Sequence, residues 1–128
     1  PYRRQRQMCI RDRAKLTRAY NLPARYVLHT VGPIVGRWVT WKDRRELAAC
    51  YRSCLELAKE YGCKSVDFPS ISTGVYRFPL ERAARIAMSS ISAFLKENSR
   101  PELVRMVCFD RNTMEYYERA LAELAEDK

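Results

Sequence analysis

The stretch Ser65-Val-Asp-Phe-Pro-Ser-Ile-Ser-Thr-Gly-Val-Tyr-Arg-Phe-Pro79 decides the fold of this chain. Its first half predicts a buried β-strand that ends at a loop of small residues, and Pro79 predicts the first turn of a helix. At such a junction several backbone N–H groups lack a partner within the chain, and the helix dipole adds partial positive charge. Gly74 is expected to take positive φ and so to turn consecutive amides inward. The stretch therefore predicts either a phosphate-binding loop or an ordinary strand-to-helix connection.

Strands and helices alternate on both sides of this stretch. Short β-branched and aromatic runs predict strands over 26–31, 65–71 and 103–109. Apolar residues spaced three and four apart predict helices over 47–61, 80–95 and 114–124. Asn112 or Thr113 is the expected N-cap of the last helix. The alternation predicts a largely parallel sheet with helices on both faces, joined by right-handed crossovers.

Three loops are expected to share one rim of this sheet. They follow the carboxyl ends of the strands, where ligands bind in α/β folds, and they cover residues 32–41, 72–78 and 110–113. Val75, Tyr76 and Phe78 are apolar or aromatic residues in the middle loop. They are expected either to flank a sugar or a base or to fold back onto the helix.

Composition describes one small domain. The chain has 128 residues and is 47% hydrophobic, which suffices for a single core. No apolar run is long enough to cross a bilayer and no secretory signal is recognisable, so a cytoplasmic protein without membrane contact is expected. The five cysteines are odd in number and lie mostly within periodic helix or strand patterns, so reduced core thiols are predicted.

The net charge of +9 is unevenly distributed. Residues 1–18 hold seven basic side chains and one acidic one, Asp12, which leaves the remainder of the chain only weakly basic. A basic arm of this kind binds nucleic acid weakly and with steep salt dependence. Nucleic acid is therefore kept as an unlikely partner, and a basic nucleic-acid-binding α/β domain as an alternative function.

Three blocks of the sequence carry a specific resemblance, namely 14–33, 47–58 and 71–79. They resemble, in order, the edge strand and next strand, the helix with its Cys-Tyr pair, and the second phosphate loop of a macro domain, the fold that binds ADP-ribose. The match runs from about Ala14 to Leu121. The resemblance implies a three-layer α/β/α fold with a mostly parallel sheet that lacks its amino-terminal strands.

The same resemblance implies a set of site residues. The loop that holds the diphosphate and the distal ribose corresponds to Ser72, Thr73, Gly74, Val75, Tyr76 and Arg77. The adenine side corresponds to Phe109, Asp110 and Asn112. Asp67 stands where the family usually has a small apolar residue, and it is expected to need a charge partner or to face a gap in the sheet.

Several family elements have no counterpart in the sequence. The opening strand, the asparagine-rich strand end and the glycine-run loop are missing, and one absent strand belongs between 26–31 and 65–71. Residues 14–128 are therefore expected to form a truncated macro domain, and residues 1–13 a foreign basic segment outside it.

The function expected from the resemblance is binding of ADP-ribose, free or carried on a mono-ADP-ribosylated protein. Tyr20-Asn-Leu-Pro23 and Arg77 resemble the zinc-containing branch of microbial protein-ADP-ribose hydrolases, which implies zinc in the full-length parent. No cofactor or metal is expected in this chain, because Cys50 and Cys54 share a core-facing pattern. The catalytic half is missing, so the chain itself is expected to be inactive.

A non-catalytic ADP-ribose reader is the alternative function. His29 is expected to have a hydrogen-bonded structural role.

Overall fold

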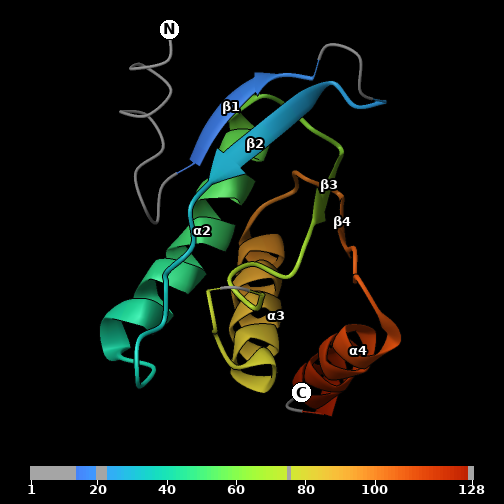
Figure 1. Cartoon of the computed structure of the whole chain (residues 1–128). Helices are drawn as coiled ribbons and strands as arrows, with labels where there is room; N and C mark the ends of the chain where they lie inside the picture. The colour runs from blue at the N-terminus through green and yellow to red at the C-terminus, as the bar shows by residue number, and fades with distance from the viewer. Residues whose placement is uncertain (1–13, 20–22, 75, 127–128) are drawn as a thin grey trace, which may run out of the picture.

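The structure is a computed structural model that describes residues 14–19, 23–74 and 76–126. Its elements are β1 (Ala14–Arg18), β2 (Tyr26–Thr30), α2 (Trp41–Glu60), β3 (Ser65–Phe68), α3 (Leu80–Glu97), β4 (Leu103–Met106) and α4 (Arg111–Glu126), as Figure 1 shows. The predicted helices and strands are therefore confirmed in order and type. The segment 1–13, the first three residues of the Tyr20–Pro23 motif and Val75 lie outside the described residues.

Helix α2 begins earlier than its apolar spacing indicates. Thr40 is the N-cap: the amide of Asp43 donates to Thr40 Oγ1 at 3.1 Å, and the amide of Thr40 donates to Asp43 Oδ2 at 2.9 Å. This capping box satisfies two amides at the start of the helix. At the other end Gly62 takes a φ of 67°, which stops the helix where the sequence predicted.

The strands form two separate pairs. Strands β1 and β2 are antiparallel, with Ala14 opposite Thr30, whereas β3 and β4 are parallel, with Ser65 opposite Leu103. The described strands therefore form one antiparallel and one parallel pair instead of the single, largely parallel sheet that was expected. Among the described residues no strand lies between β2 and β3 to join the two pairs.

Helices cover one face of the β3–β4 pair. Val66 and Phe68 of β3 belong to the core, and Val104 and Met106 of β4 pack against it. The opposite face is exposed and carries an ion pair, in which Arg105 Nε donates to Asp67 Oδ1 at 2.8 Å. Asp67 thus has the charge partner that its position required. Helices were expected on both faces of the sheet, but the described helices cover only one face of this pair.

The core is centred on α2, which packs on α3, which in turn packs on α4 (Figure 1). Leu47, Tyr51 and Leu55 of α2 are fully buried. Cys50 and Cys54 lie on the same buried face and form no disulfide, which confirms their prediction as reduced core residues. None of the described helices combines the length and apolar character needed to cross a membrane.

Candidate functional site

The loop between β3 and α3 is held by hydrogen bonds to the side chain of a tyrosine of α2. The hydroxyl of Tyr51 accepts the amide hydrogen of Ile71 at 3.2 Å and donates to the carbonyl of Pro69 at 3.4 Å. We call residues 71–78 the site loop. Burial raises the pKa of Tyr51 well above its ordinary value, so its hydroxyl stays protonated and able to donate.

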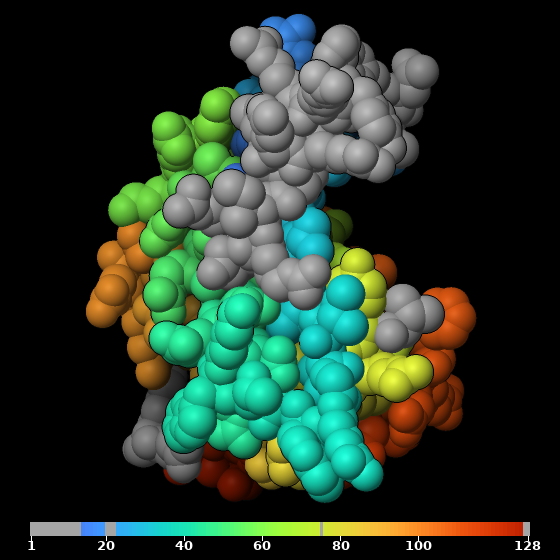
Figure 2. All heavy atoms as spheres, turned by 60° about the vertical axis from the view of Figure 1, so that its left-hand side comes forward, coloured from blue at the N-terminus to red at the C-terminus, as the bar shows by residue number. Residues whose placement is uncertain are grey.

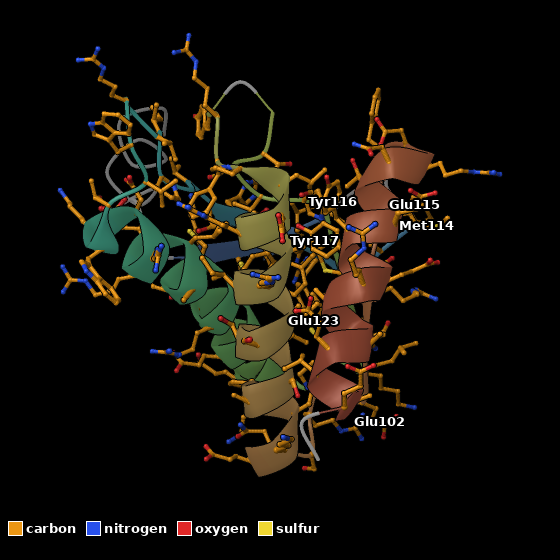
Figure 3. All side chains as sticks on the ribbon, turned by 90° about the horizontal axis from the view of Figure 1, so that it is seen from below. Glu102, Met114, Glu115, Tyr116, Tyr117 and Glu123 are labelled. Atoms are coloured by element: carbon orange, nitrogen blue, oxygen red, sulfur yellow. The ribbon has the colours of Figure 1, made fainter. Side chains whose placement is uncertain are left out.

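A second tyrosine supports the site loop from α4. Tyr117, which lies between α3 and α4 in Figure 3, shares a hydrogen bond of 2.6 Å with Ser70 Oγ. The hydroxyl of Thr73 donates to the same Ser70 oxygen at 2.8 Å. Two helices distant in sequence therefore fix the start of the site loop through hydroxyl groups.

The site loop closes on itself at its second half. The amide of Phe78 donates to the carbonyl of Ser72 at 2.8 Å, and the amide of Arg77 donates to the carbonyl of Gly74 at 3.0 Å. Phe78 is buried in the core and anchors the end of the loop, whereas Tyr76 is half-buried. Phe78 thus folds back onto the protein, which was one of the two predicted alternatives.

The site loop has backbone amides without an acceptor among the described residues. Within the part of the chain that the structure describes, the N–H groups of Ser72, Thr73, Gly74 and Tyr76 donate to no protein acceptor. Successive open amides of this kind form an anion-binding concavity. Arg77 contributes an exposed side chain beside them, although its own backbone amide already donates to the carbonyl of Gly74.

The backbone conformation of the loop differs from the prediction. Positive φ angles occur at Ser72, with 65°, and at Arg77, with 64°, whereas Gly74 has no positive φ. The prediction that Gly74 turns the amides is therefore wrong. The two residues that take the left-handed conformation stand at the closing hydrogen bonds of the loop, where they turn the chain.

The start of α3 adds further donors. Pro79 is the N-cap rather than a residue of the first turn, and no side chain caps this end. The carbonyl of Pro79 accepts the amide of Ala83 at 2.9 Å, but the amides of Leu80, Glu81 and Arg82 lie before the first intrahelical bond. The helix dipole therefore directs partial positive charge toward the end of the site loop.

The loop after β2 lies directly against the site loop. The amide of Val35 donates to the carbonyl of Tyr76 at 2.8 Å. Gly32 lies so close that a Cβ atom there would collide with Ser72 Oγ and would stand 2.7 Å from Ile71 Cγ2. Two of the three loops predicted to share a rim are thus in contact.

The third loop holds the proposed adenine-side residues. Phe109 is 96% exposed. Asp110 accepts the amide hydrogen of Thr113 at 2.8 Å, and this bond lowers the pKa of its carboxyl group. The N-cap of α4 is therefore Asp110, and the prediction of Asn112 or Thr113 is wrong because both already belong to the helix. Asn112 is an exposed residue of the first turn.

Neither of two surface grooves is lined by the site loop. An apolar groove of about 490 Å³ lies between α3, β4 and α4, and a more polar one of about 450 Å³ lies between α2 and α3. Tyr117 lines the first groove and also contacts Ser70, so it connects this groove with the base of the site loop.

The described residues do not fit a zinc ion. They contain no group of three or more His, Cys, Asp or Glu side chains that could hold a metal. Burial raises the pKa of Cys54 to about 12, which disfavours the thiolate that zinc requires. His29 Nε2 shares a hydrogen bond of 2.8 Å with Thr17 Oγ1 across β1 and β2, which confirms that this side chain is hydrogen-bonded as predicted.

Comparison with known protein families identifies the family to which this chain belongs. The family model described as Macro domain matches residues 1–87. The chain belongs to the macro domain family. This confirms the family and the α/β fold class that the sequence predicted.

Similar macro domain proteins come from archaea, bacteria and animals. A macro domain-containing protein of Methanosarcina mazei is 45% identical over 91% of this chain and 62% of its own length. An O-acetyl-ADP-ribose deacetylase of Escherichia fergusonii is 40% identical over 98% of this chain and 70% of its own length. The ADP-ribose glycohydrolase MACROD2 of Xenopus laevis is 42% identical over 90% of this chain and 28% of its own length. The chain thus spans less than two thirds of the Methanosarcina relative.

Solved macro domains share the fold. The Oceanobacillus iheyensis macrodomain with ADP superposes with a TM-score of 0.85 at 40% identity, covering 93% of this chain and 62% of that one. The Trypanosoma brucei macrodomain in complex with ADP-ribose superposes with a TM-score of 0.79 at 40% identity, covering 88% of this chain and 47% of that one. Both superpositions therefore cover most of this macro domain chain and leave more than a third of the solved chain without a counterpart.

Proposed function

We propose that this chain binds ADP-ribose through Ser72, Thr73, Gly74, Val75, Tyr76 and Arg77 and contributes this loop to a protein-ADP-ribose hydrolase. The open amides of the site loop, which lead to the uncapped start of α3, are the observation that supports binding most strongly. A diphosphate requires donors of this kind, and the positive end of a helix favours its charge. The ring of Tyr76 is proposed to lie against the distal ribose, and Arg77 to place a cation beside the phosphates.

The adenine side of the proposal rests on the junction of β4 and α4. Phe109 offers an exposed ring on which a base can stack. Asp110 is exposed and caps α4 through Oδ1, and its carboxylate is proposed to accept from an adenine amino group. Asn112 stands two residues further on, in the first turn of α4, with both amide donors and an acceptor to offer.

Hydrolysis is proposed for the whole protein, and this chain alone is expected to bind without cleaving. Release of ADP-ribose from a protein needs a positioned water and groups that stabilise an oxocarbenium-like centre. Among the described residues, His29 is engaged with Thr17 and Asp67 with Arg105, so neither is free as a base.

The names of the Xenopus and Escherichia relatives, a glycohydrolase and a deacetylase, support a hydrolase. Membership of the zinc-containing branch is part of this proposal, with the metal's ligands outside the described residues.

A non-catalytic ADP-ribose reader is the second candidate. The open amides favour it as well, because binding requires donors but no hydrolytic group. The two candidates separate when the intact protein is incubated with a mono-ADP-ribosylated substrate. Release of ADP-ribose supports the hydrolase, and stable capture of the modified substrate supports the reader.

Binding by this chain is tested by titrating ADP-ribose into the ¹⁵N-labelled protein and following amide chemical shifts, a method that detects millimolar affinity. We expect weak binding, with the largest shifts at Thr73, Gly74 and Tyr76. Gly74→Glu should abolish the shifts by placing a carboxylate among the donors. Gly36→Glu is the matched control, since a Cβ meets nothing within 4 Å at either glycine. Shifts confined to other segments, or none at millimolar ligand, would overturn the proposal.

A further inference from the structure

The segment that joins β2 to α2 carries two tryptophans that are almost fully exposed. Trp38 is 75% exposed and Trp41 is 77% exposed. Tryptophan is largely buried in most folded proteins, and two exposed indoles within four residues form an unusually apolar patch. Neither tryptophan belongs to the core cluster of the described residues or packs against it.

Each of these tryptophans has its own arginine. The guanidinium carbon of Arg37 lies 5.8 Å from the ring centroid of Trp38, and that of Arg44 lies 5.3 Å from the centroid of Trp41. A guanidinium in this position covers one face of an indole through a cation–π contact. The large exposed fractions leave much of each ring open, so each ring can still accept a second planar group.

The charge around the two rings is positive. We call Arg37, Trp38, Trp41, Arg44 and Arg45 the Trp–Arg surface, and all five are exposed. Asp43 is engaged in the capping box with Thr40, and Glu46 Oε1 lies 3.8 Å from Lys42 Nζ. The nearby carboxylates are thus occupied by other partners, and the three arginines are left to attract an anion.

We propose that the Trp–Arg surface binds single-stranded nucleic acid. Unpaired bases stack on the open faces of Trp38 and Trp41, and the neighbouring arginines contact the phosphates between them. An acidic protein segment would satisfy the arginines but would leave the two indoles uncovered, so the combination favours a polyanion with planar groups. The binding is expected to be largely independent of base sequence.

The place of this surface in the fold distinguishes it from the proposed ADP-ribose site. Figure 2 shows the segment around residue 40, in cyan to teal, at the lower front of the molecule, beside the yellow atoms of the residues near 78. The two regions are neighbours, since Val35 bonds to Tyr76, but they share no residue. The surface also differs from the basic residues of 1–18, which carry no tryptophan.

The experiment uses the whole chain and a short fluorescent oligothymidine, without ADP-ribose, so its outcome is independent of the proposed function. The chain contains two tryptophans, and both lie on this surface. Intrinsic tryptophan fluorescence therefore reports directly on the Trp–Arg surface. We expect quenching on binding, together with increased anisotropy of the oligonucleotide, and weaker binding of a duplex whose bases are already paired.

Variants separate the aromatic and charged contributions. The double variant Trp38→Ala with Trp41→Ala should weaken oligothymidine binding by about tenfold or more. Arg37→Ala with Arg44→Ala should reduce the slope of log K against log salt by about 1.4, the value for two lost phosphate contacts on a single strand. Tyr116→Ala with Arg119→Ala is the matched control, because Arg119 lies 5.3 Å from the Tyr116 ring on α4. This control should bind like the wild type.

Four results would overturn the proposal. Absence of oligothymidine binding is the first, and an anisotropy change without tryptophan quenching, which indicates binding elsewhere on the chain, is the second. The third is a loss of affinity in the Tyr116 and Arg119 control equal to that of the tryptophan variant. The fourth is equal binding of an oligoglutamate peptide that survives both tryptophan substitutions, since this would identify an acidic protein segment as the ligand.

Discussion

Gly32 and Ser72 lie in direct contact, and a single methyl group on Gly32 would collide with Ser72 Oγ. Gly32 follows β2, and Ser72 belongs to the loop proposed to hold a diphosphate. The hydroxyl of Ser72 is buried and has no hydrogen-bond partner among the described residues. The absence of a side chain at residue 32 therefore allows the close approach of a loop that is forty residues further along the chain.

Gly32→Ala is expected to displace the site loop. The new Cβ has to push Ser72 and Ile71 aside, and overpacking of this kind costs about 1–3 kcal/mol. Urea denaturation measures the loss, and the amide shifts of Thr73 and Gly74 report the displacement. Gly36→Ala is the control, because a Cβ there meets nothing within 4 Å, and it should leave both unchanged. Equal stability of the two variants would contradict the close contact.

Tyr51→Phe should loosen the start of the site loop while keeping the core filled. The substitution removes the oxygen that accepts from Ile71 and leaves that amide unpaired, at a cost of about 1–3 kcal/mol if it stays buried. We expect faster hydrogen exchange at Ile71 and weaker ADP-ribose binding. Tyr61→Phe removes a hydroxyl from a ring that is 47% exposed, and it serves as the control. Unchanged exchange at Ile71 in the Tyr51 variant would show that the bond does not hold the loop.

Alkaline pH should destabilise the protein through Cys54. Burial raises the pKa of this thiol from 9.0 to about 12, so the unfolded chain loses the proton first as the pH rises. Between these two values the free energy of unfolding should fall by up to about 1.4 kcal/mol per pH unit from this group. Urea denaturation at several pH values above 9 measures the slope, which Cys54→Ala should make less steep. Parallel slopes for the two proteins would exclude Cys54 as the cause.

Asp110→Ala should destabilise α4 at neutral pH, since it removes the acceptor for the amide of Thr113. Asp110→Asn should retain most of the cap. The amide of Thr113 lowers the pKa of Asp110, so the stabilisation is present above the ordinary value of 3.8 and is lost as the pH falls through the lowered pKa. Thermal midpoints of wild type and Asp110→Ala should therefore converge in acid. A constant difference across this pH range would contradict a role for the charged carboxylate.

The order and type of the elements could be predicted because apolar spacing is a local property of the sequence. Strand ends were less accurate: β3 ends at Phe68 rather than Ile71, since Pro69 has no amide to continue the ladder. With β3 ended, β4 also ends early, at Met106 rather than Phe109. Among the described residues no strand joins the two pairs, and the antiparallel pairing of β1 with β2 is the feature that the expectation of a mostly parallel sheet missed.

The supports of the site loop could not be predicted in the same way. Tyr51 and Tyr117 fit the apolar stripes of their helices, and the spacing that assigns them to the core does not show where their hydroxyl groups reach. Gly74 was expected to provide positive φ because glycine does so without strain. The closing bond from Phe78 to Ser72 instead determines which residues turn, and it selects Ser72 and Arg77.

The open face of the β3–β4 pair has a consequence for solubility. Uncovered strands tend to associate with other chains and to start aggregation, and charged side chains in the middle of such strands act as gatekeepers against it. Asp67 and Arg105 stand opposite each other at the centre of this face. A second chain that packed on these strands would have to desolvate both charged groups. The ion pair therefore disfavours self-association of the protein through this face.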